Sequence, residues 1–503
     1  LRRIVFPKNM YWDDPGTRFA RPIRWLLCLW DDEVIPLTFA GCVADRFTSG
    51  HRFLGQKRVE VPSVRAYMDL LYDNYVIVDQ DKRRERMTGA IAALEKEIDG
   101  KADLTPALVE ENLDLVEYPV PFFGTFEDRF LDMPPEVLTT TMAVHQRYFP
   151  VHNSQGKLLP LFVGVSNNRA TSMAVVREGN ERVLRARLSD AAFFWAEDQK
   201  RPLASRVEEL GNIVYQERLG TLLDKSRRTQ AIARHLGGTL GLDEGSRRDL
   251  ERSAFLAKAD LVTHMVYEFG ELRGVMGREY ARKSGENDRV ARAIYEQYLP
   301  AAAGDRLPSD ILGALLGVAD RMDTVVACHK VGLDPTGSQD PYGLRRAARC
   351  MNEIFWGLSL DGDLKELVRV AAQEIGAGDD VVSRVESFLQ ARLQVQLKER
   401  GYPHDVVTLA MGVAWHRPLH LERLLDTLQG VASEAWFQAL VTAACRVRNI
   451  LTKAGNPPAG WREELLQEEG ERHMAQAVAD LSPEVHGAVK DFDWRKLTEA
   501  LAR

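Results

Sequence analysis

The chain has 503 residues, of which 45% are hydrophobic and 28% are charged, and its formal net charge is −7. This composition excludes a fibrous or intrinsically disordered protein, and the length predicts about three or four domains at roughly 100–200 residues each. The negative net charge excludes an overall field that attracts nucleic acid, so any contact with RNA must come from local clusters of Arg and Lys.

The five cysteines are far apart and never form the C-x-x-C spacing of a zinc site, so we expect free thiols in a reducing compartment. The best apolar run, Ile23–Trp30, is far shorter than the roughly 18 residues that a membrane span needs. Leu1–Met10 lacks the apolar stretch of a secretory signal, and the chain does not begin with Met. We therefore expect a cytoplasmic protein with no membrane partner, whose chain starts inside a gene product.

The first 200 residues predict a mixed α/β domain. Short runs rich in β-branched and aromatic residues, bounded by turn residues, predict strands at Ile23–Trp30, Val34–Phe39, Tyr75–Val78 and Lys157–Asn167. Helices are predicted at Lys82–Ile98 and Glu181–Trp195. In the second helix, the spacing of Leu184, Leu188, Ala191 and Trp195 places four apolar side chains on one face. Pro202 and Leu203 mark a boundary.

The rest of the chain predicts helices almost throughout, separated by loops rich in Gly and Pro. Residues 203–360 predict helices at Leu222–Leu240, Arg247–Phe269, Asp288–Leu299, Ser309–Cys328 and Tyr342–Leu358. Residues 361–503 predict helices at Asp363–Gly376, Asp380–Glu399, Asp405–Ala414, His420–Gly430 and Glu434–Lys453. The fold class that we expect is α+β, with one mixed domain followed by two mainly helical regions.

A search for catalytic motifs finds no phosphate-binding loop, no dinucleotide fingerprint and no hydrolase or metalloprotease signature. Thr141 and His145 share one helix face and could pair as nucleophile and base, but no orienting acid accompanies them, so packing is favoured. The segment Gly50–Gly55 (GHRFLG) is basic and could contact phosphate, although a tight loop is the default interpretation. We assign no catalytic residue.

Two helical segments resemble the metal-binding helices of HD-type phosphohydrolases, which carry His, His-Asp and Asp. They are Ala254–Leu261 (AFLAKADL), which places Asp260 at the second motif, and Val318–Thr324 (VADRMDT), which places Asp320 at the third. Ala259 stands where the second motif has histidine, and no histidine lies near Asp224, where the first would be. Two lone carboxylates bind a divalent ion weakly, so we assign no metal. We expect Asp260 and Asp320 to be structural, hydrogen-bonded or paired with Lys258 and Arg321.

Clusters of basic residues are the candidates for contact with RNA, because arginine pairs with phosphate in a bidentate manner. The candidate residues are Arg182 and Arg185, Arg345 and Arg346, and Arg446, Arg448 and Lys453. For each cluster the alternative is an intramolecular salt bridge or a solvated helix face. The last cluster is favoured for RNA, since it lies on a helix near a polar turn, Gly455–Pro458, in an otherwise acidic chain.

Long segments of the chain resemble the β chain of bacterial two-chain glycyl-tRNA synthetases and occur in that family's order. They are Thr48–Gly55 (TSGHRFLG), Thr139–Val151 (TTTMAVHQRYFPV), Val176–Asp198, Leu210–Lys225, Leu256–Ala281, Ile294–Pro300 and Val318–Ala348. The family has a further segment before FPKNMYWDD and an anticodon-binding domain that continues past Arg503. We therefore expect a fragment or a trimmed chain.

The resemblance implies an α2β2 enzyme that joins glycine to tRNA-Gly with ATP and Mg²⁺. The α subunit would make glycyl-adenylate, and the β chain would bind tRNA and hold no cofactor of its own. The resemblance also implies a domain over residues 1–200 similar to one in the phenylalanyl-tRNA synthetase β chain. A degenerate HD-like domain over 203–360 and a partial anticodon-binding-type bundle over 361–503 would follow. The latter would place Arg446, Arg448 and Lys453 near RNA.

Two other functions compete with this interpretation. Asp260 and Asp320 would suit an HD-type metal-dependent phosphohydrolase, which stoichiometric bound metal would favour. The basic clusters would also suit an RNA-binding protein with no enzymatic partner, which co-purification of a smaller subunit would exclude.

Overall fold

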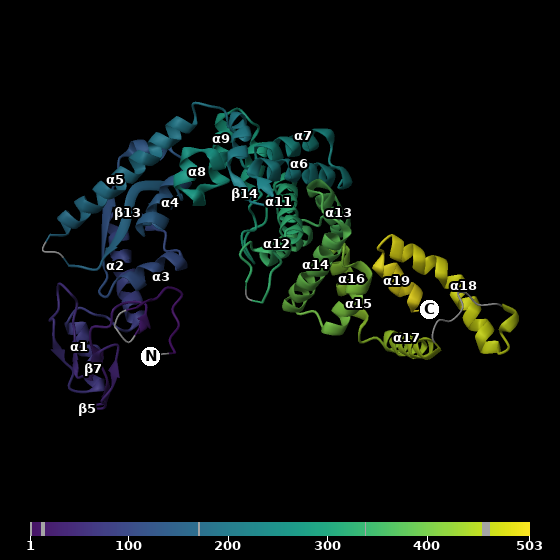
Figure 1. Ribbon diagram of the computed structural model, residues 1–503, viewed down its shortest axis with the longest axis horizontal. Helices are drawn as coiled ribbons and strands as arrows, with labels where there is room; N and C mark the ends of the chain where they lie inside the picture. Colours follow the sequence, from purple (N-terminus) through teal and green to yellow (C-terminus); the bar gives the residue numbers. More distant parts are fainter. Residues whose placement is uncertain (1–2, 12–15, 170–171, 338, 455–462, 503) are drawn as a thin grey trace. The chain divides into compact units, whose positions relative to one another are not determined.

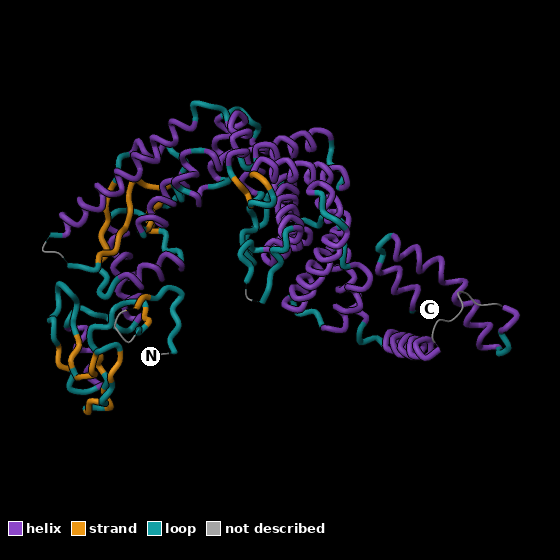
Figure 2. Tube along the Cα trace, in the orientation of Figure 1, coloured by secondary structure: helices purple, strands orange, loops and turns teal. Residues whose placement is uncertain are grey.

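The computed structural model describes residues 3–11, 16–169, 172–337, 339–454 and 463–502. The chain divides into two compact units, Leu1–Glu197 and Asp198–Arg503 (Figure 1). Most strands belong to the first unit, whereas the second is mainly helical (Figure 2). The predicted α+β class is confirmed. The predicted separation of 203–360 from 361–503 stays a prediction, and helices from both ranges contribute to one hydrophobic core.

The N-terminal strands of the first unit are short. They are β1 (Met10–Tyr11), β2 (Arg18–Phe19), β3 (Leu26–Leu27), β4 (Leu29–Trp30), β5 (Glu33–Val34), β6 (Thr38–Phe39), β7 (Cys42–Asp45), β8 (Phe47–Thr48) and β9 (Val59–Glu60). The predicted strand Ile23–Trp30 is broken because its halves have different partners: β3 pairs in parallel with β7, and β4 forms a hairpin with β5. The predicted strand Val34–Phe39 is also broken, at Pro36, which has no N–H to donate to a neighbouring strand.

The predicted strand Tyr75–Val78 is wrong. These residues form the connection between α1 (Tyr67–Asp73) and α2 (Gln80–Glu97). Tyr75 has a φ of 59°, a left-handed conformation that interrupts an extended run. The aromatic and β-branched residues of this segment pack a loop against the core and do not pair as a strand, and Ile77 is buried.

The main sheet of the first unit is antiparallel, with the order β10-β12-β13-β11. Its strands are β10 (Lys101–Ala102), β11 (Val120–Thr125), β12 (Phe149–His152) and β13 (Leu158–Ser166). The predicted strand Lys157–Asn167 is confirmed as β13. It is buried in its centre because the sheet is covered on both faces.

Helices α2 and α3 (Pro106–Leu115) cover one face of this sheet, where Met87, Ile91 and Leu113 pack with Phe149 and Val163. The predicted helix Lys82–Ile98 is confirmed as α2, and its start is set by Asp79, whose side chain accepts hydrogen bonds from the N–H groups of residues 81 and 82.

The opposite face of the sheet is covered by α5 (Met173–Asp198), which includes the predicted helix Glu181–Trp195. Glu181 of this helix accepts a hydrogen bond from the N–H of Thr125 at the end of β11. Leu184, Leu188 and Ala191 of the predicted apolar stripe are fully buried, and Trp195 is half-buried. The spacing of the stripe thus identified the packed face of α5.

The second unit contains a short hairpin, β14 (Val214–Gln216) and β15 (Gly220–Thr221), and a succession of helices. The helices are α6 (Leu222–Thr239), α7 (Glu244–Leu256), α8 (His264–Glu268), α9 (Val275–Lys283), α10 (Asp288–Glu296), α11 (Ile311–Lys330), α12 (Leu344–Gly357), α13 (Leu364–Ile375), α14 (Asp379–Glu399), α15 (His404–Ala414), α16 (Pro418–Val431), α17 (Ala435–Ala454), α18 (Glu469–Lys490) and α19 (Trp494–Leu501). Apart from 247–269, the predicted helices are confirmed within a few residues at their ends.

Helix α11 is the centre of this unit, and it packs against α6, α7, α10, α12, α13 and α14. Its sequence explains the position, because most of its residues are small or apolar and most are buried. At Gly313 an added Cβ would lie 2.5 Å from the Cβ of Glu296, so glycine allows the end of α10 to approach α11 closely.

The single helix predicted over Arg247–Phe269 is wrong. The structure has α7, a 3-10 turn at Ala259–Val262, and then α8. Thr263 is extended and caps α8 by accepting a hydrogen bond from the N–H of Val266. The carboxylate of Asp198 accepts two more, from the N–H groups of His264 and Met265, and so stabilises a second helix start inside the predicted one.

The last helices of the second unit differ in their packing. Trp494 of α19 is buried and donates a hydrogen bond from its indole nitrogen to the carbonyl of His420. Helix α17, which matches the predicted helix Glu434–Lys453, is exposed along most of its length. The polar turn Gly455–Pro458 lies outside the described residues. Among the helices that the structure describes, none is long and apolar enough to cross a membrane.

Candidate functional site

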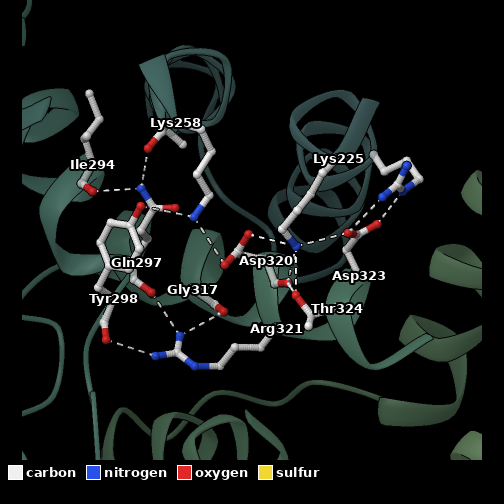
Figure 3. Close-up of polar contacts among 12 residues, drawn as sticks. Lys225, Lys258, Ile294, Gln297, Tyr298, Gly317, Asp320, Arg321, Asp323 and Thr324 are labelled. Atoms are coloured by element: carbon white, nitrogen blue, oxygen red, sulfur yellow. Dashed lines mark hydrogen bonds and ion pairs between the residues drawn. The ribbon is translucent and has the colours of Figure 1, made fainter. Parts of the chain in front are cut away.

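Helices α6 and α11 bring a group of charged side chains together in the interior of the second unit (Figure 3). The start of α6 is fixed by a reciprocal cap, in which Thr221 and Asp224 exchange hydrogen bonds between side chain and backbone. Asp224, near the position where an HD-type site would have its first histidine, is therefore a capping residue. The next residue, Lys225, points into the interior.

The ammonium group of Lys225 lies between two carboxylates of α11. Its Nζ is 3.1 Å from Asp320 Oδ1 and 3.1 Å from Asp323 Oδ2, and it donates a hydrogen bond to the Thr324 hydroxyl at 2.8 Å. Arg228, one turn further along α6, pairs with Asp323 at 2.6 Å. Burial opposes the charge on Lys225, but Asp320 and Asp323 outweigh it and raise the pKa of Lys225.

A second buried lysine reaches Asp320 from the end of α7. The Nζ of Lys258 is 3.3 Å from Asp320 Oδ2 and 3.4 Å from the hydroxyl of Tyr298 (Figure 3). Burial lowers the pKa of Lys258 despite the attraction of Asp320. Burial would raise the pKa of Asp320, but the two lysines outweigh it, and the net shift is downward. Asp320 is thus held as a carboxylate by two ammonium groups.

Asp260 belongs to a different set of contacts. Its Oδ2 accepts hydrogen bonds from the N–H groups of Gly274, at 2.6 Å, and Gly277, at 3.2 Å, at the start of α9. The side chain is completely buried, and burial raises the pKa of Asp260 above its usual range. Asp260 therefore ties the 3-10 turn to α9, and the expectation that it is hydrogen-bonded is confirmed.

The expected pairing of Asp320 is confirmed for Lys258 but wrong for Arg321. The guanidinium of Arg321 instead donates to backbone carbonyls: to Gln297 and Gly317 through Nη1, and to residues 298, 299 and 300 through Nη2. An arginine side chain turned toward the end of α10 fits these oxygens because its five N–H groups are arranged as a planar fork. Arg321 thereby anchors the segment that follows α10.

This arrangement does not fit a divalent metal. The space between Asp320 and Asp323 holds the Lys225 ammonium, which repels a cation. In the part of the chain that the structure describes, no group of three or more His, Cys, Asp or Glu side chains could hold a metal ion. The chemistry of the donor set is that of a buried ion-pair network.

Lys225, Arg228 and Asp323 were missed in the sequence. A signal was present, because Lys225 and Arg228 are three residues apart, as are Asp320 and Asp323, so each pair faces one side of its helix. The sequence alone did not show that these two faces meet, since α6 and α11 are about 100 residues apart in the chain.

The candidate pair Thr141 and His145 lies where α4 (Pro135–Thr140) widens into a π-turn at Thr141–His145. The Thr141 hydroxyl is fully buried and donates to the carbonyl of Val137 at 2.7 Å, which leaves no nucleophile facing a substrate. In the segment Gly50–Gly55, His51 is buried and its Nδ1 accepts from the N–H groups of Phe53 and Leu54. The tight-loop interpretation of this segment is confirmed.

Of the two candidate RNA-binding residues of the first unit, one is ion-paired within the chain and the other is exposed. Arg185 of α5 is ion-paired with Glu127 at 2.7 Å, so the intramolecular alternative holds there. Arg182, one turn earlier, is exposed, and no ion pair joins it to any residue that the structure describes.

The two candidate residues at the start of α12 also differ in their surroundings. Arg345 donates to the carbonyl of Gly337 at 2.8 Å, which fixes the preceding loop. Arg346 is exposed and lines a cavity together with Arg273 and Arg321. The cavity brings together segments around residues 273, 298, 321 and 346, which the sequence did not group.

The cluster on α17 is the most exposed of the three. Arg446, Arg448 and Lys453 are all on the surface, and within the described ranges none of them has an ion-pair partner. Arg446 and Lys453 are seven residues apart and so share one face of the helix. Arg448 lies on another side and lines a groove between α15, α16 and α17.

A family model and the most similar curated proteins all indicate the same family. The model of the family described as "Glycyl-tRNA synthetase beta subunit" matches residues 1–412. A protein of Moorella thermoacetica called "Glycine--tRNA ligase beta subunit" is 43% identical over 517 aligned positions, which cover 100% of this chain and 73% of that protein. A protein with the same name from Syntrophomonas wolfei is 39% identical, over 100% of this chain and 73% of its own length. Another, from Halothermothrix orenii, is 42% identical, over 90% of this chain and 66% of its own length.

Proposed function

The chain belongs to the family of glycyl-tRNA synthetase beta subunits, and we propose that it is the subunit that holds tRNA-Gly while an α subunit activates glycine. It is part of a glycine–tRNA ligase, an enzyme of protein synthesis, and the designation β implies a complex with an α subunit. The observation that carries the proposal is the similarity to proteins of this name along the whole chain.

In the proposed division of labour, the holoenzyme is an α2β2 tetramer in the cytoplasm that uses ATP and Mg²⁺ at a site on the α subunit. The interior of the second unit supports this division. Asp320 and Asp323 are engaged by Lys225, Lys258 and Arg228, so these carboxylates are not free to act as general bases or metal ligands. The phosphohydrolase and the stand-alone RNA-binding protein find no comparable support.

The proposed tRNA contact is supported by the exposed cations of α17. Arg446 and Lys453 project from one face of a helix that is solvent-exposed throughout this stretch. A free guanidinium or ammonium group can displace counterions from the phosphate backbone, whereas one already paired with a carboxylate cannot do so without losing that partner. Because the net charge of the chain is −7, such a local patch carries the attraction.

Aminoacylation assays test the proposal directly. This chain alone, the α subunit alone and their mixture are compared in glycine-dependent ATP–pyrophosphate exchange and in charging of tRNA-Gly. We expect no exchange and no charging with this chain alone, exchange with the α subunit, and charging only with the mixture. Charging by this chain alone, or charging by the α subunit at an unchanged rate without it, would contradict the proposed roles.

A further inference from the structure

The cavity beside Arg346 is a distinct feature of the second unit. It has a volume of about 510 Å³, within the range of small-molecule sites, and it is lined by the turn before α9, the end of α10, α11 and the start of α12. We call it the arginine pocket and define it by Arg273, Arg321 and Arg346 together with Tyr298 and Tyr342. All of these elements belong to one compact unit.

The positive charge of the arginine pocket is not neutralised. The five hydrogen bonds of Arg321 all go to uncharged backbone carbonyls. Arg273 lies over the ring of Tyr298, with its Cζ 5.6 Å from the ring centroid. Neither Arg273 nor Arg346 has an ion-pair partner among the residues that the structure describes.

The carboxylates at the pocket do not restore the balance. Asp320 lines the pocket, but the ammonium groups of Lys225 and Lys258 both lie against its carboxylate. The negative charge of Asp320 is therefore already offset by these two lysines. Glu271 is the other acidic residue of the lining and is exposed at the surface. Three arginines line the cavity with two carboxylates, one of which is already held by two lysines, and together they give a concave surface that attracts anions.

The walls of the arginine pocket are suited to an aromatic ring as well as to an anion. Tyr342 is 40% exposed and offers a ring at the mouth of the cavity. Tyr298 lines the wall of the cavity opposite Arg273, whose guanidinium lies over its ring. Arg321 donates to the carbonyls of residues 297–300, which fixes the wall between Tyr298 and α11. Figure 3 shows the bonds to Gln297 and Tyr298. Arginines that bind phosphate beside a ring that stacks on a base are the elements of nucleotide recognition.

We propose that the arginine pocket binds a nucleotide, with its phosphate between Arg273 and Arg346 and its base against Tyr342. The phosphate can belong to a free mononucleotide or to one nucleotide of an RNA strand, since both present the same anion and the same ring. This site is separate from the cations of α17, and the proposal holds whether or not α17 contacts tRNA.

A double variant tests the pocket. In Arg273→Gln/Arg346→Gln, two exposed cations are removed while Arg321, which anchors the wall, is kept. Arg369→Gln is the control for removal of an arginine elsewhere, because Arg369 is exposed on α13 and does not line the pocket. Thermal unfolding of both variants should match that of the parent, since substitutions of exposed residues have little effect on stability.

Binding is measured by equilibrium dialysis with radiolabelled AMP, GMP, CMP and UMP, and by fluorescence anisotropy with a labelled single-stranded RNA 12-mer. Loss of two charge-assisted contacts should weaken binding about 10-fold or more in the double variant, with no change in Arg369→Gln. Weakened mononucleotide binding identifies a free nucleotide as the ligand. Weakened RNA binding without detectable mononucleotide binding identifies an RNA strand.

Equal affinities of the parent and the double variant for every probe would overturn the proposal, as would absence of binding to all of them. Neither outcome bears on the aminoacylation assay or on the cations of α17, which concern the proposed tRNA role instead. The two proposals are thus tested separately.

Discussion

Lys225 shows how a single residue organises the interior of the second unit. Its side chain is only 6% exposed, yet its ammonium group contacts two carboxylates and a hydroxyl. Taking such a charge out of water costs several kcal/mol, and the cost is offset only when opposite charges and hydrogen bonds satisfy it. Lys225 therefore stabilises the fold only together with Asp320 and Asp323.

Replacing Lys225 by methionine should strongly destabilise the protein. Lys225→Met keeps the apolar stem but leaves Asp320 and Asp323 with fewer partners in the interior, and loss of one partner of a buried pair costs about 3–5 kcal/mol. Arg227→Met is the control on the same helix, because its side chain is 62% exposed and its ion pair should contribute about 1 kcal/mol or less. Urea unfolding followed by circular dichroism measures both. Equal midpoints for the two variants would show that the buried network is dispensable.

The carboxylate of Asp320 should make the stability depend on pH. Burial would raise the pKa of Asp320, but Lys225 and Lys258 outweigh it, so this pKa is lower in the folded state than in the unfolded chain. The contribution of Asp320 to stability is therefore present above the unfolded pKa of about 3.9 and is lost as the pH falls from there toward the folded pKa. Asp320→Asn should be less stable than the parent at pH 7, and the difference in urea midpoint should shrink below about pH 4, because Asp320 is then protonated in the unfolded chain while it is still ionised in the folded one.

The matched control for Asp320→Asn is Glu244→Gln, since Glu244 is 87% exposed and should change the stability little at any pH. A difference between Asp320→Asn and the parent that stays constant from pH 7 to pH 3 would mean that the Asp320 carboxylate does not supply the stabilisation.

At the scale of elements, α9 and α10 depend on a close approach at Gly277. A Cβ on this residue would lie 2.6 Å from Cγ2 of Ile294 and 3.1 Å from Oδ2 of Asp260, and both neighbours are buried. The N–H of Gly277 donates to Asp260, and an added Cβ would crowd the oxygen that accepts this bond. The helix pair and the buried carboxylate therefore require the same residue.

Gly277→Ala and Gly412→Ala should have opposite effects on stability. Alanine at 277 overpacks the α9–α10 contact and should destabilise by about 1–3 kcal/mol. Gly412 lies in the exposed part of α15 with no atom within 4 Å of an added Cβ, so alanine there should stabilise by about 0.5–1 kcal/mol through helix propensity. Thermal unfolding of the two variants provides the comparison, and a loss of stability in both would contradict the steric explanation.

The exposed cations of α17 should control the affinity for tRNA-Gly if this helix contacts the phosphate backbone. Arg446→Glu/Lys453→Glu, which reverses the charges on one face of the helix, should weaken binding about 10-fold or more at 0.1 M salt, and the slope of log K against log salt should become shallower by about one to two units. Arg369→Glu/Arg423→Glu, two exposed substitutions on α13 and α16, is the charge-matched control. Titrations of labelled tRNA-Gly at 50–200 mM salt measure both quantities, and an unchanged slope would place the RNA face elsewhere.

At the scale of the whole molecule, the two compact units are built on different principles. The first is a sheet with helices on both faces, and the second surrounds a mostly apolar helix, α11, with helices from a long stretch of sequence. Helices α13 and α14, which the sequence assigned to a separate region, share the core with α6 and α11. Composition does not change sharply at residue 360, and contacts across it are visible only in three dimensions.

Much of the secondary structure was predictable because it depends on neighbours in sequence. Caps such as Asp79 and apolar stripes such as that of α5 act within a few residues, so they determine where helices begin and which face is packed. The errors occurred where a distant group competes. Asp198 stabilises a second helix start at α8, and Tyr75 turns the chain where β-branched residues predicted a strand.

The family, the α+β class and the spacing of Asp260 and Asp320 followed from the amino-acid sequence by itself, since they depend on the identity and order of residues along the chain. Only the tertiary structure decided that Lys225 lies between Asp320 and Asp323, that Arg321 binds carbonyls, and that Arg273 and Arg346 line one cavity. Each of these facts depends on contacts between segments that are separate in the sequence. Electrostatic partners are chosen by distance in space, and that distance is set by packing around α11.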